Sequence, residues 1–193
     1  MELKVVGIVG SARKGGNTEL LANLALEEIR KEGIEIELIS LAGKRINPCD
    51  GCGGCSKTDK CRFKDDFEEV YAKVLDADGL ILASPVYYGA ASPQISAFIS
   101  RFYPKHGKPL SRKVGGPIVV ARRAGQNFTF AQLMYFFMIH EMIVPGSTYW
   151  NVTFGRAKGD ALKDEEGVNT VRRFGQNMAW LLKKIKSSDA TES

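Results

Sequence analysis

The chain has 193 residues, of which 44% are hydrophobic and 25% are charged. This composition is typical of one globular domain that can bury its own core. The formal net charge is +5, but basic residues are interleaved with acids, so nucleic acid is not an expected partner. No apolar run approaches the roughly twenty residues that cross a bilayer, and the N-terminus does not resemble a signal peptide. We therefore expect a cytoplasmic protein without a membrane segment.

Short β-branched runs alternate with longer amphipathic segments along the chain, which indicates alternating strands and helices. The runs predict strands over 4–11, 34–43, 79–87, 115–125 and 143–150. The other segments predict helices over 17–33, 66–77, 92–105, 127–142 and 165–186, followed by a flexible tail over 187–193. Five such repeats require parallel strands joined by right-handed crossovers. We predict one doubly wound α/β domain over 1–186, with helices on both faces of a five-stranded parallel sheet in the order 2-1-3-4-5.

In this architecture, the loops that leave the carboxyl ends of the strands form the site. The first loop, "GSARKGGNT" over 10–18, leads directly into a helix. Ser11 and Thr18 supply hydroxyls, Arg13 supplies a positive charge, and Asn17 or Thr18 can cap the helix. The Walker ending and the dinucleotide glycine spacing are both absent, so the loop predicts a cradle for one terminal phosphate. The alternative is a glycine-rich turn with a helix cap.

Two further loops have the composition of a slot for a planar ring. "SPVYYGAASP" over 84–93 combines aromatic and small residues, and "ARRAGQN" over 121–127 supplies cations and an amide suited to a flavin pyrimidine edge. The alternatives are an edge turn and a solvated charge pair. The candidate ring-binding residues are Pro85, Val86, Tyr87, Tyr88, Gly89, Ser92, Arg122, Arg123, Gly125 and Gln126.

Four cysteines occur within thirteen residues, "CDGCGGCSKTDKC", in an insertion over 44–65. Structural zinc usually takes two C-x2-C pairs separated by a dozen or more residues, and this set is more compact. Three cysteines at successive x2 intervals, with a longer step to the fourth, favour a [4Fe-4S] cluster. A zinc site and a set of redox thiols remain alternatives. The predicted ligands are Cys49, Cys52, Cys55 and Cys61.

The phosphate loop and "SPVYYGAASP" together resemble the flavodoxin-like NAD(P)H-dependent FMN reductase superfamily. The cysteine set narrows the resemblance to its iron-sulfur flavoproteins. The resemblance implies a flavodoxin-like fold that binds FMN and a [4Fe-4S] cluster. It also implies tetramers in which the cluster approaches the FMN of a neighbouring subunit, and an acceptor such as dioxygen or hydrogen peroxide. We expect a homo-oligomer, a dimer or tetramer, with contacts from Phe128, Phe130, Met134, Phe137, Met138 and Met142, although a helix buried within the subunit is equally compatible.

The first functional hypothesis is an FMN-dependent oxidoreductase whose cluster takes electrons from an acidic, ferredoxin-type donor for reduction of a small-molecule oxidant. Lys57, Lys60, Arg62 and Lys64 are candidates to steer the donor, or are solvated loop charges. The rivals are an NAD(P)H-dependent FMN or quinone reductase, and a non-enzymatic electron carrier or iron-sulfur sensor. No catalytic side chain is identified beyond the cofactors, and neither His106 nor His140 has the context of a ligand.

Overall fold

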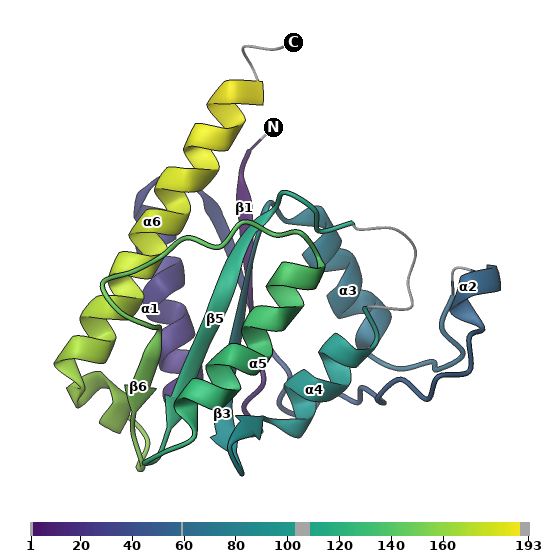
Figure 1. The fold of residues 1–193 in the computed structure, drawn as a ribbon, viewed down its shortest axis with the longest axis horizontal. Helices are drawn as coiled ribbons and strands as arrows, with labels where there is room; N and C mark the ends of the chain where they lie inside the picture. The colour runs from purple at the N-terminus through teal and green to yellow at the C-terminus, as the bar shows by residue number, and fades with distance from the viewer. Residues whose placement is uncertain (1, 59, 103–108, 190–193) are drawn as a thin grey trace.

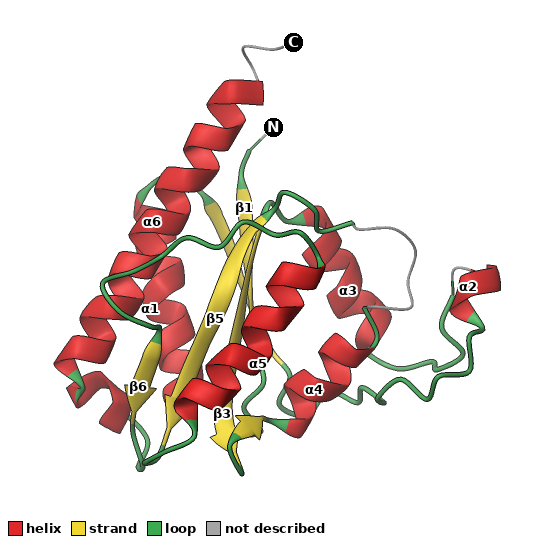
Figure 2. Ribbon diagram, viewed as in Figure 1, coloured by secondary structure: helices red, strands yellow, loops and turns green. Residues whose placement is uncertain are grey.

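The structure, a computed structural model, describes residues 2–58, 60–102 and 109–189. It consists of a twisted sheet between two helical layers (Figure 2). The strands are β1 (Lys4–Val9), β2 (Glu35–Ser40), β3 (Gly79–Tyr87), β4 (Ala90–Ala91), β5 (Val114–Ala121) and β6 (Val152–Phe154). The helices are α1 (Asn17–Lys31), α2 (Cys55–Thr58), α3 (Phe67–Asp76), α4 (Pro93–Ser100), α5 (Gln126–Ile139), the 3-10 helix η1 (Asp160–Lys163) and α6 (Glu165–Asp189).

The sheet order is β2-β1-β3-β5-β6, and all of these pairs are parallel. This confirms the predicted flavodoxin-like order 2-1-3-4-5. The sequence did not predict β4, which has two residues and pairs antiparallel with the end of β3. Since the order reverses between β1 and β3, their carboxyl ends open a crevice at one edge of the sheet.

Successive residues of each central strand face opposite helical layers, as the two-residue period of a strand requires. Val5 and Val9 pack with α1 and α6, whereas Val6 and Ile8 pack with α3, α4 and α5. Figure 1 shows the same division, with α1 and α6 on one side of the sheet and α3, α4 and α5 on the other. Two apolar cores, one on each face, therefore hold the strand ends in place.

The predicted strand over 143–150 was wrong. Ile143 makes an isolated bridge to Val114, and the strand that joins β5 is β6, which begins at Val152. Pro145 and Gly146 follow Ile143 and favour irregular backbone. Trp150 is 50% exposed, so its aromatic side chain is not part of a buried strand.

Two predicted helix ends also need correction. The helix predicted over 92–105 ends at Ser100 in α4, and residues 103–105 lie outside the described part of the chain, as does His106. The last helix continues to Asp189, three residues beyond the predicted end at 186. Within the described ranges, no helix combines the length and apolar character needed to span a bilayer.

Candidate functional site

A cavity of about 540 Å³ lies at the carboxyl edge of the sheet. The loops after β1, β5 and β6 and the carboxyl end of β3 contribute to it, as expected of a doubly wound fold. Its lining includes these predicted site residues: Ser11, Arg13, Asn17, Thr18, Pro85, Val86, Tyr87 and Arg122. The structure thus brings the phosphate loop and parts of both ring loops to one place.

The loop between β1 and α1 is built around Ser11, which is only 6% exposed. Its hydroxyl accepts a hydrogen bond from the Arg13 amide at 3.1 Å, which closes a tight turn. α1 then begins with Gly16 as its N-cap, and no side chain caps it. The first amides of α1, with Arg13, form an electropositive end suited to a phosphate.

Asn17 does not cap α1, contrary to one predicted role. Its side-chain amide donates to the Ala157 carbonyl at 2.8 Å, and its Oδ1 accepts from the Gly159 amide at 2.7 Å. Thr18 is buried, with 2% exposure, within the first turn. Asn17 therefore fastens the loop after β6 beside the phosphate loop.

The loops after β3 and β5 touch each other through glycines. Gly125, the N-cap of α5, has φ 86°, and a Cβ added there would lie 2.9 Å from the Gly89 Cα. Gly89 also has a positive φ of 79°. Position 125 has no room for a side chain, whereas a Cβ added at Gly89 would meet nothing within 4 Å, so at 89 only the positive φ favours glycine. Gly125 therefore sets the distance between the two ring loops.

Several predicted ring residues do not line the cavity. Tyr88 is fully exposed in a left-handed conformation with φ 53°. The buried Ser92 hydroxyl caps α4 by accepting from Ile95 N, and it donates to the Gly10 carbonyl. The remaining predicted residues outside the lining are Gly89, Arg123, Gly125 and Gln126.

Sequence reasoning missed the contribution of the loop after β6. Arg156 and Lys158 line the cavity beside Lys14, and Gly16, Val120 and Gly155 complete the missed set. With Arg13 and Arg122, the lining contains five cationic side chains and no acidic one. This charge favours an anionic ligand. The signal was "GRAKG" after the last strand, which the misplaced strand prediction hid.

The four cysteines lie in a loop that extends away from the sheet and carries α2 (Figure 1). Cys52 is exposed, the other three are half-buried, and the four form no disulfide. All four line one cavity of about 310 Å³. Gly51 and Gly53 have positive φ, and the Gly51 amide donates to Cys49 Sγ at 3.4 Å. Within the described ranges, no group of three or more cysteine, histidine or acidic side chains is gathered tightly enough to hold a metal ion.

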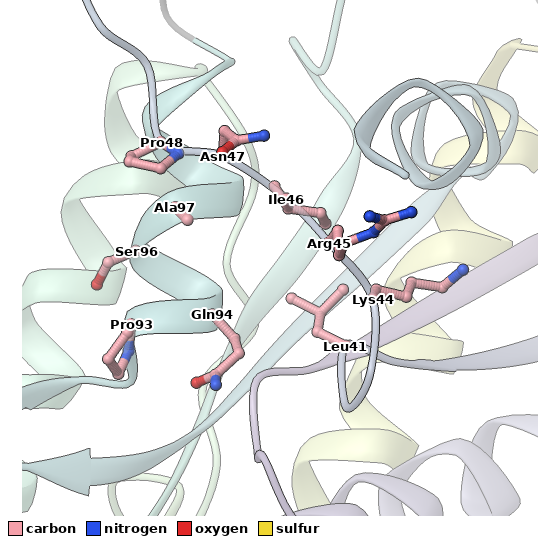
Figure 3. A pocket seen from close by; sticks show the side chains of 10 residues that line it. All are labelled: Leu41, Lys44, Arg45, Ile46, Asn47, Pro48, Pro93, Gln94, Ser96 and Ala97. Atoms are coloured by element: carbon pink, nitrogen blue, oxygen red, sulfur yellow. The ribbon is translucent and has the colours of Figure 1, made fainter. Parts of the chain in front are cut away.

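The donor set nonetheless fits an iron-sulfur cluster in its chemistry. Four thiols share one hollow, and glycines let the backbone bend around it and direct an amide toward sulfur. The thiol cavity and the phosphate-loop cavity have no lining residue in common. A third cavity, of about 770 Å³, separates α4 from the segment 41–48 that leads to the cysteines, and Gln94 and Leu41 point into it from opposite sides (Figure 3).

Residues 3–157 match the family model of NADPH-dependent FMN reductases. This chain belongs to that family. Within it, the chain is a member of the iron-sulfur flavoproteins. It is 44% identical over 192 residues to an iron-sulfur flavoprotein of Methanocaldococcus jannaschii, covering 95% of this chain and 100% of that protein. It is 33% identical to the iron-sulfur flavoprotein of Methanosarcina thermophila, covering 96% of this chain and 98% of that protein.

Solved structures support the fold of this iron-sulfur flavoprotein. RosB with bound 8-demethyl-8-formylriboflavin-5'-phosphate is 18% identical and has a TM-score of 0.76. Its superposition covers 96% of this chain and 81% of that one. A flavodoxin, the WrbA-like protein from Agrobacterium tumefaciens, is 16% identical and has a TM-score of 0.67. Its superposition covers 95% of this chain and 99% of that one. The family match and the iron-sulfur flavoprotein relatives, rather than these structures, show that the cofactor is FMN and that the activity is that of an FMN-dependent oxidoreductase.

Proposed function

We propose that this iron-sulfur flavoprotein takes electrons from a ferredoxin-type donor through a [4Fe-4S] cluster on Cys49, Cys52, Cys55 and Cys61, and delivers them through FMN to dioxygen or hydrogen peroxide. The observation that carries the proposal is the pairing of two separate sites in one chain. One is a cationic cavity at the sheet edge, and the other is a hollow lined by four thiols.

The residues divide into two sets by task. Arg13 and the amides at the start of α1 bind the flavin phosphate. Pro85, Val86 and Tyr87 form the walls of the cavity around the flavin ring. The four thiolates hold the cluster. When bound, the cluster exchanges single electrons and FMN exchanges pairs, so two reduced donors and two protons convert one hydrogen peroxide to two waters.

The donor is proposed to dock at the cysteine loop. Lys57, Lys60, Arg62 and Lys64 are all exposed there, although Arg62 also pairs with Asp50. A cluster of positive charge attracts an acidic carrier and raises its association rate.

A homo-oligomer is part of the proposal because the two cavities of one chain are separate. A neighbouring copy would supply the cluster to this flavin, as the family resemblance implies. Of the predicted contact residues, Phe128 and Met138 are 77% and 65% exposed, whereas Phe137 and Met142 are buried in the core. Tyr135 and Ile139 extend the exposed apolar face of α5.

The cofactors are tested by purification without oxygen, followed by assays of iron, sulfide and FMN. We expect about four iron and four sulfide with one FMN per chain. Zinc, or no metal, at the four thiols would refute the cluster. Light scattering of the same sample measures the oligomeric state, and a monomer would refute the shared site.

A second candidate function is an NADPH-dependent FMN or quinone reductase, which the family match favours. The surplus of cations beside the phosphate loop is compatible with a second anionic nucleotide. This function predicts rapid bleaching of the flavin by NADPH and full turnover after Cys49→Ala. The first function predicts slow bleaching by NADPH and loss of ferredoxin-driven turnover in that variant.

A further inference from the structure

A buried ion pair joins the two ends of the cysteine loop, residues 47–65. Arg101 Nη1 lies 2.7 and 2.8 Å from the two carboxylate oxygens of Asp65, and the two side chains are 2% and 5% exposed. The same carboxylate accepts hydrogen bonds from the backbone amide of Asn47 at 2.8 Å and from its side chain at 3.0 Å. Asp65 therefore links the end of the loop to its beginning, and Arg101 fixes both to the end of α4.

Aromatic and hydroxyl contacts complete this attachment. The Arg101 guanidinium lies over the Phe67 ring at 4.1 Å and over the Phe63 ring at 5.6 Å, and Phe63 itself lines the thiol cavity. The Ser100 hydroxyl accepts a hydrogen bond from the backbone amide of Cys49 at 3.0 Å. The first predicted ligand is thus anchored one residue from Arg101.

The other end of α4 is attached to two of the loops that surround the flavin cavity. Ser92, the N-cap of α4, donates from its hydroxyl to the Gly10 carbonyl at 2.6 Å, and its amide donates to Ser84 Oγ at 2.9 Å. Gly10 and Ser84 begin the phosphate loop and the first ring loop. One end of α4 is therefore attached to the cysteine loop, and the other end is attached to the phosphate loop and the first ring loop. Figure 1 shows α4 between the end of β3 and the chain that leads to α2.

The ion pair is not fully satisfied by hydrogen bonds. Arg101 Nε and Nη2 are buried and have no partner among the described residues. A buried charge pair adds little to stability relative to apolar residues, and buried donors are normally bonded. The Arg101–Asp65 pair therefore adds little to stability, yet it lies where the cysteine loop joins the fold. This combination points to a role in the cysteine site.

We propose that Arg101 and Asp65 are positioning residues that fix the cysteine loop to α4 and set the electrostatic surroundings of the cluster. This inference rests on the proposed function. One-electron reduction changes the charge of a [4Fe-4S] cluster with its four thiolates from about −2 to −3. A neighbouring cation favours the reduced form, and a neighbouring anion disfavours it.

The two halves of the pair therefore predict opposite shifts of the cluster midpoint potential. Arg101→Gln leaves the Asp65 carboxylate uncompensated, so the potential becomes more negative. Asp65→Asn leaves the guanidinium uncompensated, so the potential becomes less negative. Arg101→Lys keeps the charge and stays near the wild-type potential. A pair that only stabilises the fold would loosen the loop in either variant and shift both potentials in the same direction.

The test is a redox titration of the holoprotein, prepared without oxygen and followed by the EPR signal of the reduced cluster. In parallel, an iron chelator should remove iron about 10-fold faster from Arg101→Gln than from wild type. The matched control is Glu28→Gln, which breaks an arginine–carboxylate pair far from the cysteines in the sequence: the carboxylate of Glu28 is buried, and Arg172, its partner at 3.1 Å, is partly exposed. It should leave the potential and the chelation rate unchanged.

Equal potentials in Arg101→Gln and Asp65→Asn, or shifts in one direction, would overturn the inference. A wild-type chain that binds no cluster refutes the proposed function instead, and the attachment of the loop is then tested on the apoprotein. Hydrogen exchange of the Asn47 and Cys49 amides should rise in Arg101→Gln and not in Glu28→Gln. Unchanged exchange in Arg101→Gln would overturn the attachment as well.

Discussion

Arg13 is the residue that most directly tests the phosphate site. Its charge lies at the cavity beside the start of α1. A charge-assisted hydrogen bond contributes about 1.5–3 kcal/mol, so Arg13→Ala should weaken FMN binding about 10- to 100-fold. The measurement is FMN titration of the apoprotein by fluorescence. Arg173→Ala, an exposed arginine of α6, is the matched control and should bind FMN as wild type does. Equal affinity in both variants would remove Arg13 from the site.

Cys52→Ser tests whether the proposed cluster and FMN occupy independent sites, because Cys52 lines the thiol cavity and not the flavin cavity. Cys52→Ser should therefore lose most of its iron and sulfide and keep its FMN and its fold. Iron and flavin assays on one preparation, with circular dichroism for the fold, provide the measurement. Loss of both cofactors together would show that the two sites are not independent.

Single residues were predictable where chemistry and position coincide. The place of Ser11 and Arg13 in the cavity was predictable from the loop alone, because a strand, a turn and a helix follow one another there. The role of Asn17 was not predictable from this loop, since its hydrogen-bond partners Ala157 and Gly159 come from a loop about 140 residues further along the chain. The conformation of Tyr88, with φ 53° and a fully exposed ring, is set by the β3–β4 turn, which the sequence did not predict.

At the scale of elements, the contact of the β3 and β5 loops through Gly125 yields a stability prediction. Gly125→Ala adds a Cβ 2.9 Å from the Gly89 Cα at a positive φ, so it should cost about 2–5 kcal/mol and weaken FMN binding. Gly33→Ala is the control, because its φ is 76° and its added Cβ meets nothing within 4 Å. It should cost only about 1–2 kcal/mol. Urea unfolding compares the two, and equal costs would contradict the close contact.

The pairing of α1 and α6 has a pH dependence centred on Glu28. Hydrogen bonds from Lys31 and Gln176 lower the pKa of its carboxyl below the ordinary value near 4.5, against the effect of burial. The group therefore stabilises the fold above pH 4.5, and this contribution is lost as the pH falls through the lowered pKa. In urea unfolding, wild type should be more stable than Glu28→Gln at pH 7, and the difference should shrink below pH 4.5. A difference that grows toward low pH would contradict this sign.

Elements were predictable where periodicity and burial agree. The alternation of Val5 and Val9 with Val6 and Ile8 between two cores is what a buried parallel strand requires, and the strand was found. The last strand was misplaced because residues 143–150 include several apolar and aromatic side chains but also contain Pro145 and Gly146, and β6 itself has only three residues. The error hid the loop that carries Arg156 and Lys158.

For the whole molecule, the order of strands and helices was sufficient to predict the topology, since right-handed crossovers leave few alternatives. The path of the cysteine loop was not predictable in this way. Its attachment depends on Arg101 and Asp65, which are 36 residues apart and meet only in the folded chain. The spacing of the cysteines indicated the chemistry of the donor set, and the fold placed that set apart from the flavin cavity.

This separation makes the donor-docking proposal testable at the scale of the molecule. Lys57→Glu with Lys60→Glu reverses the charge of the exposed cysteine loop, so reduction by ferredoxin should slow at least about 10-fold at low salt, and the dependence on salt should flatten. Stopped-flow reduction over a range of ionic strength measures both effects. Arg173→Glu with Lys186→Glu makes the same change of net charge on α6, which lies across the molecule from α2 (Figure 1). If the two double variants slow reduction equally, only net charge matters, and the donor does not dock at the cysteine loop.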